Sequence, residues 1–145
     1  MSCNFKNVSY KPGQIHFPER KKQLLDYSGL KLGNITPTDL DGLIEWHNEK
    51  YILIEVKYGN APMPTGQKIA LERMAADLHS KGKNSIVLLA QHNVKDCAET
   101  VDFTKCTVRE IYYPSLRKWL SINSGLKADD LIYSFLGVTT EEAPW

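Results

Sequence analysis

The sequence lacks the features that would assign it to several specialised classes of protein. It has only 3 cysteines, without the paired short spacings of a zinc site, which argues against a disulfide framework or a structural metal site. No apolar run approaches the roughly 20 residues that a membrane helix needs, and the first residues lack the apolar centre of a signal peptide. We therefore expect a cytoplasmic protein with reduced thiols and no membrane association.

The chain also lacks an excess of charge of either sign. Lys and Arg number 18 against 17 Asp and Glu, which gives a formal net charge of +1. A field this weak does not hold a polyanion by itself, so any binding of a polyanion must depend on local groups.

What is present is an ordinary globular composition. Hydrophobic residues make up 42% of the 145 residues and charged residues 24%, with 9 Gly and 7 Pro, which excludes disordered and collagen-like chains. A chain of this length fits one core better than two. We expect one domain over residues 1–145.

Hydrophobic periodicity predicts the order of helices and strands. The short polar connection 47–50 indicates that the strands on either side of it form an antiparallel hairpin. The helix after the hairpin then leads, as a right-handed crossover, to a strand parallel to the second strand of the hairpin. The order is that of an α/β sheet with helices on both faces. The predicted helices cover residues 18–32, 65–81, 116–120 and 126–136, and the predicted strands cover 39–46, 51–57, 85–90 and 107–113.

The predicted helix 65–81 has one apolar face that begins with an amide. Gln67, Leu71, Met74 and Leu78 follow one another at helical spacing. We expect this face to be buried against the sheet, with Gln67 at its start.

Four polar residues fall where one site could use them together. Glu55 and Lys57 are two apart near the end of a buried strand, so they share a side, and the hairpin brings Asp41 opposite Glu55. Gln67 begins the next helix. Two neighbouring carboxylates repel each other unless a cation lies between them, and Mg²⁺, or Mn²⁺ in its place, prefers such oxygen ligands. Such an ion beside an ammonium group suits hydrolysis of a phosphodiester.

These residues resemble the PD-(D/E)xK nuclease superfamily, in particular its small virus-type replication-repair and Holliday-junction-resolvase-like members, which are phage or bacterial proteins. The resemblance covers about residues 18–91. It rests on Asp41, on Glu55-Val56-Lys57 after thirteen intervening residues and on Gln67. It implies a restriction-endonuclease-like αβββαβ core with a mixed sheet over about residues 15–113, followed by a helical extension over 114–145.

The resemblance also implies roles for single residues. Asp41 and Glu55 would bind Mg²⁺ with the backbone carbonyl of Val56, Lys57 would assist the attacking water, and Gln67 would support the site. Some members carry a further carboxylate on the opening helix, for which Glu19 is the candidate. DNA is then the expected substrate, no small-molecule cofactor is expected, and a homodimer would suit cleavage of branched DNA.

Two alternatives concern single residues. The family's first motif is a proline followed by an aspartate, and here Pro37 precedes both Asp39 and Asp41. We prefer Asp41, because it has strand residues on both sides and Gly42 next to it. Short basic clusters, such as Lys68 with Arg73, could contact phosphates or be solvated helix faces.

Two further alternatives concern the function. A catalytically silent module of this fold could bind nucleic acid or protein, with Glu55 and Lys57 as an ordinary ion pair. RNA could also replace DNA as the substrate, because the site contacts the phosphate and not the sugar.

Overall fold

The computed structural model describes residues 24–139, and the chain divides into two units after Pro37. In the first unit, Met1–Pro37, the described residues 24–37 contain no helix or strand. The second unit, Thr38–Trp145, holds all of the described elements. These are β1 (Gly42–Trp46), β2 (Lys50–Tyr58), α1 (Thr65–Ser80), β3 (Asn84–His92), the 3₁₀ turn η2 (Phe103–Lys105), β4 (Thr107–Tyr113), β5 (Lys118–Ser121) and α2 (Ala128–Leu136).

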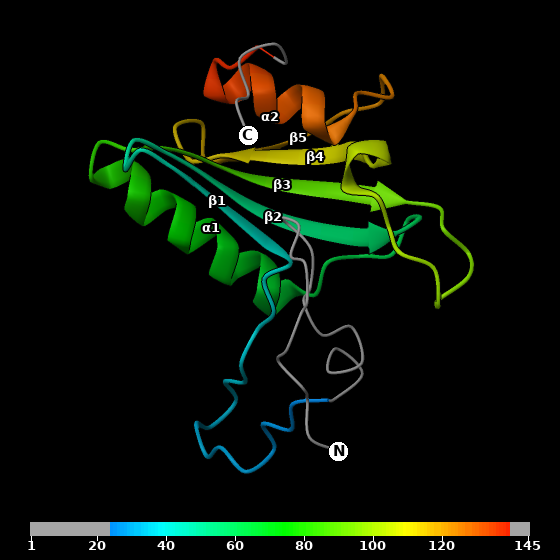
Figure 1. Ribbon diagram of the computed structural model, residues 1–145. Helices are drawn as coiled ribbons and strands as arrows, with labels where there is room; N and C mark the ends of the chain where they lie inside the picture. Colours follow the sequence, from blue (N-terminus) through cyan, green and yellow to red (C-terminus); the bar gives the residue numbers. More distant parts are fainter. Residues whose placement is uncertain (1–23, 140–145) are drawn as a thin grey trace, which may run out of the picture. The chain divides into compact units, whose positions relative to one another are not determined.

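The second unit is an α/β fold with one mixed sheet of five strands, in the order β1-β2-β3-β4-β5. β1 and β2 form the predicted antiparallel hairpin, and α1 crosses over to β3, which runs parallel to β2 as predicted. β4 and β5 complete the sheet as antiparallel strands. α1 covers one face and α2 the other, so the prediction of helices on both faces is confirmed (Figure 1).

Each face of the sheet has its own hydrophobic core. Residues of β2 alternate between them, because successive side chains of a strand point to opposite faces. Ile52 and Ile54 lie in the core under α2, whereas Leu53 packs with Leu71 and Ala75 of α1. By this alternation Glu55 and Lys57 belong to the face that α1 covers.

α1 occupies almost the predicted range, but its buried face is rotated. Gln67, Leu71 and Ala75 are buried, as spacing of four residues requires, while Met74 is 46% exposed. The prediction of Gln67 and Leu71 on the buried face is confirmed, and that of Met74 is wrong. Ala75 allows the helix to lie close to the sheet where a larger side chain would hold it away.

The predicted opening helix over residues 18–32 is wrong in its described part. Residues 24–32 are extended or in turns, and Leu24 and Leu25 are 94% and 76% exposed. A helical pattern without a surface on which to bury its apolar face does not make a stable helix. Residues 18–23, including the candidate ligand Glu19, lie outside the described residues.

The C-terminal region differs from the predicted helical extension. Residues 116–120, predicted to be helical, turn at Arg117, whose φ is 50°, and continue into β5. Trp119 thereby packs beside Tyr112 of β4, in the core under α1. Of the two helices predicted in this C-terminal region, the one over 126–136 is present, as α2. In the described part of the chain, residues 24–139, two strands precede the crossover helix, so the mixed α/β sheet is present but is not specific to the αβββαβ core implied by the resemblance.

A β-bulge interrupts β4 at Arg109. Leu89 is paired with Glu110 and Ala90 with Val108, which leaves Arg109 without a partner on β3. Val108 and Ile111 therefore both point into the core under α2, although they are three residues apart. The bulge turns Arg109 and Glu110 toward the face that α1 covers, which is a common function of bulges beside binding sites.

Candidate functional site

A carboxylate and an ammonium group meet at the end of β2, on the side of α1. Lys57 Nζ lies 2.7 Å from Glu55 Oε1, and the two side chains are 21% and 4% exposed. They share a side because they are two residues apart on a strand. The pair is therefore largely withdrawn from water, unlike the solvated ion pairs that contribute little to stability.

The second carboxylate oxygen of Glu55 has no partner. Oε2 is buried and accepts no hydrogen bond from any described residue. A buried carboxylate oxygen without a donor or a cation is costly, and native structures contain few such atoms. Within residues 24–139, Lys57 therefore compensates one oxygen of Glu55 and no hydrogen-bond donor compensates the other.

Asp41 lies beside the same stretch of β2. Gly42 is paired with Ile54, so Asp41 is one position further along, opposite Glu55. Its Oδ2 accepts a hydrogen bond of 2.8 Å from the backbone N–H of Val56. In an antiparallel pair the N–H and C=O of one residue face the same neighbouring strand. The Val56 carbonyl therefore faces the side on which Asp41 lies.

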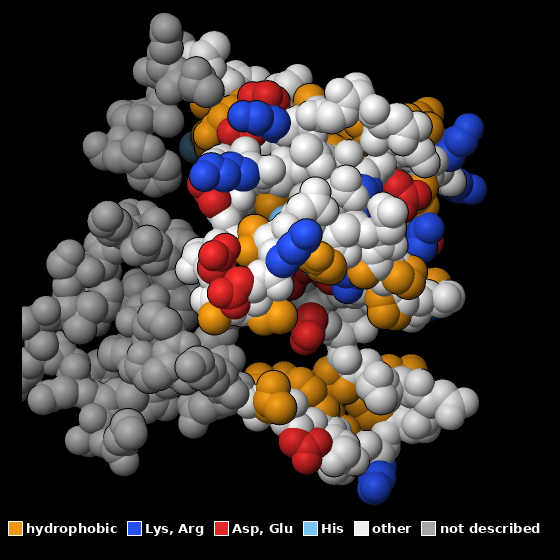
Figure 2. Space-filling view, turned by 90° about the vertical axis from the view of Figure 1, so that its right-hand side faces the viewer, with side chains coloured by type: hydrophobic (Ala, Val, Ile, Leu, Met, Phe, Trp, Pro, Cys, Tyr) orange, Lys and Arg blue, Asp and Glu red, His pale blue; other side chains and the backbone are white. Residues whose placement is uncertain are grey.

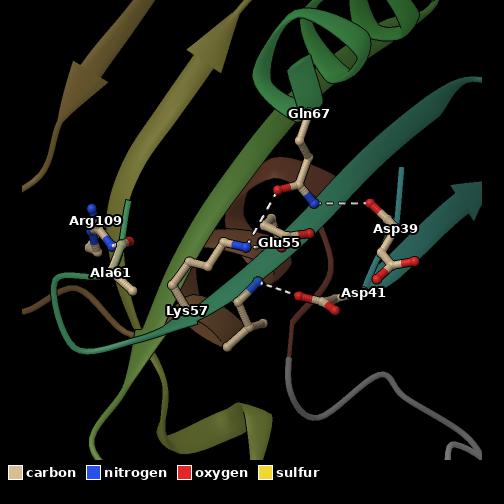
Figure 3. A network of polar contacts seen from close by, with 8 residues as sticks. Asp39, Asp41, Glu55, Lys57, Ala61, Gln67 and Arg109 are labelled. Atoms are coloured by element: carbon tan, nitrogen blue, oxygen red, sulfur yellow. Dashed lines mark hydrogen bonds and ion pairs between the residues drawn. The ribbon is translucent and has the colours of Figure 1, made fainter. Parts of the chain in front are cut away.

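Gln67 connects α1 to β2 and to the segment before β1 (Figure 3). Its Nε2 donates a hydrogen bond of 3.0 Å to the backbone carbonyl of Asp39, and its Oε1 accepts one of 3.4 Å from Lys57 Nζ. Gln67 is 8% exposed. Both ends of the buried amide are thus satisfied, and the amide fixes the Lys57 ammonium group relative to the segment before β1.

Asp39 and Asp41 differ in how they take part. Asp39 contributes its backbone carbonyl to Gln67, whereas Asp41 contributes its carboxylate to Val56. In Figure 3 the Glu55 carboxylate points into the space between Gln67 and the two aspartates. The structure therefore brings together Asp41, Glu55, Val56, Lys57 and Gln67, with Asp39 beside them.

Arg109 is a neighbour of this site that the sequence analysis missed. From β4 its Nη1 donates hydrogen bonds of 2.7 and 3.4 Å to the carbonyls of Ala61 and Gly59, in the turn that follows β2 (Figure 3). The signal in the sequence is a pair of adjacent charged residues, Arg109 and Glu110, which interrupts the alternation of the strand 107–113. Without the pairing of β3 with β4 that signal does not indicate a contact 48 residues away.

The donor set is smaller than that of a fully formed protein metal site. Within residues 24–139 there is no group of three or more acidic, histidine or cysteine side chains that could hold a metal ion. Mg²⁺ commonly binds through only one or two carboxylates and keeps several waters. Two acids and one carbonyl therefore suit Mg²⁺ better than a metal ion that needs a full set of protein ligands. The open oxygen of Glu55 fits Mg²⁺.

Comparison with known proteins adds no assignment. No family model matches the chain, and neither a curated protein nor a solved structure was found to be similar to it. Neither α1 nor α2, the helices described, is long and apolar enough to cross a membrane.

Proposed function

We propose that the chain is a Mg²⁺-dependent nuclease that hydrolyses phosphodiester bonds in DNA, with Mn²⁺ as a substitute ion. The observation that carries this proposal is the Glu55 carboxylate, which is buried beside Lys57 and has one oxygen without a partner. The resemblance of Asp41, Glu55-Val56-Lys57 and Gln67 to the PD-(D/E)xK nucleases supports the same chemistry. A branched-DNA substrate, a homodimer and a bacterial or phage cytoplasmic setting rest on that resemblance alone.

Asp41, Glu55 and the Val56 carbonyl are the groups that would hold the ion. When bound, Mg²⁺ supplies positive charge for the phosphate oxygens and lowers the pKa of nearby water. Asp41 is already oriented by the Val56 N–H, through one oxygen. The chain thus presents its oxygen ligands from two paired strands, and binding requires little rearrangement of the backbone.

Lys57 is placed to act on the water or on the phosphate. An ammonium group has three donors, and Glu55 and Gln67 accept two of them. The remaining donor is free for an oxygen of the substrate. Because Gln67 is itself held by the Asp39 carbonyl, the position of Lys57 is fixed before the substrate arrives, which reduces the cost of orientation.

A cleavage assay tests this function. Purified protein is incubated with linear, nicked and branched DNA, and with RNA, in Mg²⁺, Mn²⁺ or EDTA. The wild type is expected to cut with Mg²⁺ or Mn²⁺ and not in EDTA. The cleavage rate of Lys57→Ala is expected to be lower by on the order of 100-fold or more. Lys81→Ala, which changes an exposed lysine after the far end of α1, serves as the matched control. Equal rates for Lys57→Ala and the wild type would contradict the proposal.

One observation favours a second function, that of a catalytically silent binding module. Lys57 already neutralises one side of Glu55, so the ion pair exists without a metal. Such a module would give no heat on titration with Mn²⁺ that Asp41→Asn removes. A nuclease would give that heat, and it would cleave RNA in the assay above if its substrate is RNA.

A further inference from the structure

A small hollow lies on the same face of the sheet as the candidate site. It has a volume of about 180 Å³ and is lined by the turn after β2, the start of α1 and strands β3 to β5. Its lining includes Met63, Lys68, Leu89, Arg109, Glu110 and Trp119.

Strand pairing places this hollow next to Glu55. Leu89, in its floor, is paired with Glu55 on one side and with Glu110 on the other. Adjacent strands are about 4.8 Å apart, so the hollow begins one strand from Glu55 and ends about 10 Å away. Successive phosphates of one DNA strand advance by about 3.4 Å along the helix axis, so a DNA strand held at Glu55 would reach the hollow within a few nucleotides.

Two cations line the hollow without an acidic partner. Lys68 Nζ lies 4.8 Å from the centre of the Trp119 ring, and the Trp119 indole N–H in turn donates to the Glu72 carboxylate. Neither Lys68 nor Arg109 forms an ion pair with any residue between 24 and 139. The ring attracts the Lys68 ammonium group itself by a cation–π interaction, which keeps its charge at the edge of the hollow.

Arg109 is held equally firmly. Its Nη1 is bound to the carbonyls of Ala61 and Gly59, while the guanidinium group has five N–H donors in total. Arg109 lines the hollow and also the surface pocket next to it, and within residues 24–139 Nη1 is the atom that makes its hydrogen bonds. The lining thus holds two cations and one acid, Glu110, while the Glu72 carboxylate beside the hollow is engaged by the Trp119 indole N–H.

On the face seen in Figure 2, basic side chains are separated by acidic and hydrophobic ones, and they do not form one large basic area there. With a net charge of +1 for the whole chain, a bound polyanion must be held by a few local contacts.

We propose that this hollow is a phosphate subsite. Lys68 and Arg109 would bind there a backbone phosphate near the one that is cleaved at Glu55, on the same nucleic-acid strand. The inference rests on the proposed function for its substrate class, and it adds the place where the strand continues. Lys68 is a binding residue in this account. Arg109 both binds the phosphate and positions the turn between Lys57 and Gln67.

The experiment measures binding without cleavage. Fluorescence anisotropy is recorded with labelled single-stranded and duplex DNA, and with RNA, in EDTA and at several salt concentrations, for the wild type, Lys68→Gln and Arg73→Gln. Arg73 is the matched control, because it is exposed on the same helix and does not line the hollow. Lys68→Gln is expected to weaken binding roughly three- to tenfold and to reduce the slope of log K against log[salt] by about 0.7 to 0.9, the effect of one phosphate contact.

The inference is overturned if Lys68→Gln and Arg73→Gln weaken binding equally, or if the wild type binds none of the three nucleic acids. Cleavage is measured separately with Mg²⁺. If cleavage occurs without a specific effect of Lys68, the subsite is wrong and the nuclease function stands. If binding depends on Lys68 but no ion supports cleavage, the subsite stands and the nuclease function is wrong.

Discussion

The Asp41 carboxylate accepts a 2.8 Å hydrogen bond from the backbone N–H of Val56, the residue directly after Glu55. This contact joins the residue before β1 to the end of β2, next to Glu55. Among residues 24–139 one oxygen of the buried Glu55 carboxylate has no hydrogen-bond partner, and the proposed ion would bind there.

Replacement of Glu55 by glutamine separates function from stability. Glu55→Gln removes the buried negative charge and keeps the shape, and the Lys57 ammonium group that it leaves is 21% exposed and can be hydrated, so the free energy of unfolding in EDTA should fall by less than about 2 kcal/mol. Cleavage should fall on the order of 100-fold or more. Urea unfolding and the cleavage assay measure the two effects. A loss of stability above about 2 kcal/mol would show that Glu55 serves the fold through its ion pair.

The two aspartates are distinguished by a matched pair of variants. Asp41→Asn keeps an oxygen that can accept from the Val56 N–H, so the fold should be retained while ion binding and cleavage are lost. Asp39→Asn leaves the backbone carbonyl that Gln67 uses, so it should reduce activity much less. Rates measured under the same Mg²⁺ concentrations decide between them. Asp39→Asn with the larger loss would make Asp39 the principal ligand.

Removal of Lys57 should make the protein depend on a divalent ion for stability. Lys57→Met leaves the buried Glu55 charge without its partner, which should lower the free energy of unfolding by about 3 kcal/mol in EDTA. Mn²⁺ should then stabilise this variant more than it stabilises the wild type, because the ion replaces the missing positive charge. Thermal unfolding with and without Mn²⁺ tests this. Equal Mn²⁺ shifts for both proteins would contradict an ion at Glu55.

Arg109 should stabilise the turn that carries the site. Arg109→Met removes charge-assisted hydrogen bonds to two carbonyls, with an expected loss of about 1–3 kcal/mol in the free energy of unfolding. Arg117→Met changes an exposed arginine in the turn before β5 and should have little effect. Urea unfolding compares the two. Similar losses would mean that the contact with residues 59 and 61 contributes nothing specific.

Cys97 and Cys106 should differ in reactivity. Burial raises the pKa of the Cys106 thiol, and the nearby Asp102 carboxylate adds to the effect, whereas Cys97 is exposed. In a Cys3→Ser background, a thiol reagent at neutral pH should modify Cys97 quickly and Cys106 only after unfolding. Since the unfolded state releases the Cys106 proton at lower pH than the folded state, stability should decrease as the pH rises above the ordinary thiol range. Modification of both thiols at one rate would contradict this burial.

The central hairpin and crossover could be predicted because their patterns are complete within short stretches. Polar residues 47–50 separate two apolar runs, and Glu55 to Leu89 is a strand, a helix and a strand in sequence. The positions of Asp41, Glu55 and Lys57 follow from the hairpin register alone. This is why the geometry of the site could be anticipated without tertiary information.

The remaining features depend on contacts between distant segments. Lys118–Ser121 forms β5, in which Trp119 packs beside Tyr112, and nothing in the predicted helix 116–120 indicates this partner. The segment 24–32 has a helical pattern, but its leucines are exposed. The pattern does not show whether another part of the protein covers them, and a helix of this length needs such packing. Arg109 and the Asp39 carbonyl contribute through backbone contacts, which side-chain identity does not reveal.

Calorimetric titration of the metal-free protein with Mn²⁺ tests the shared ion most directly. The wild type should bind with measurable heat, Asp41→Asn and Glu55→Gln should each abolish it, and Asp39→Asn should retain it. Heat that is absent from the wild type, or unchanged in Asp41→Asn and Glu55→Gln, would contradict the account.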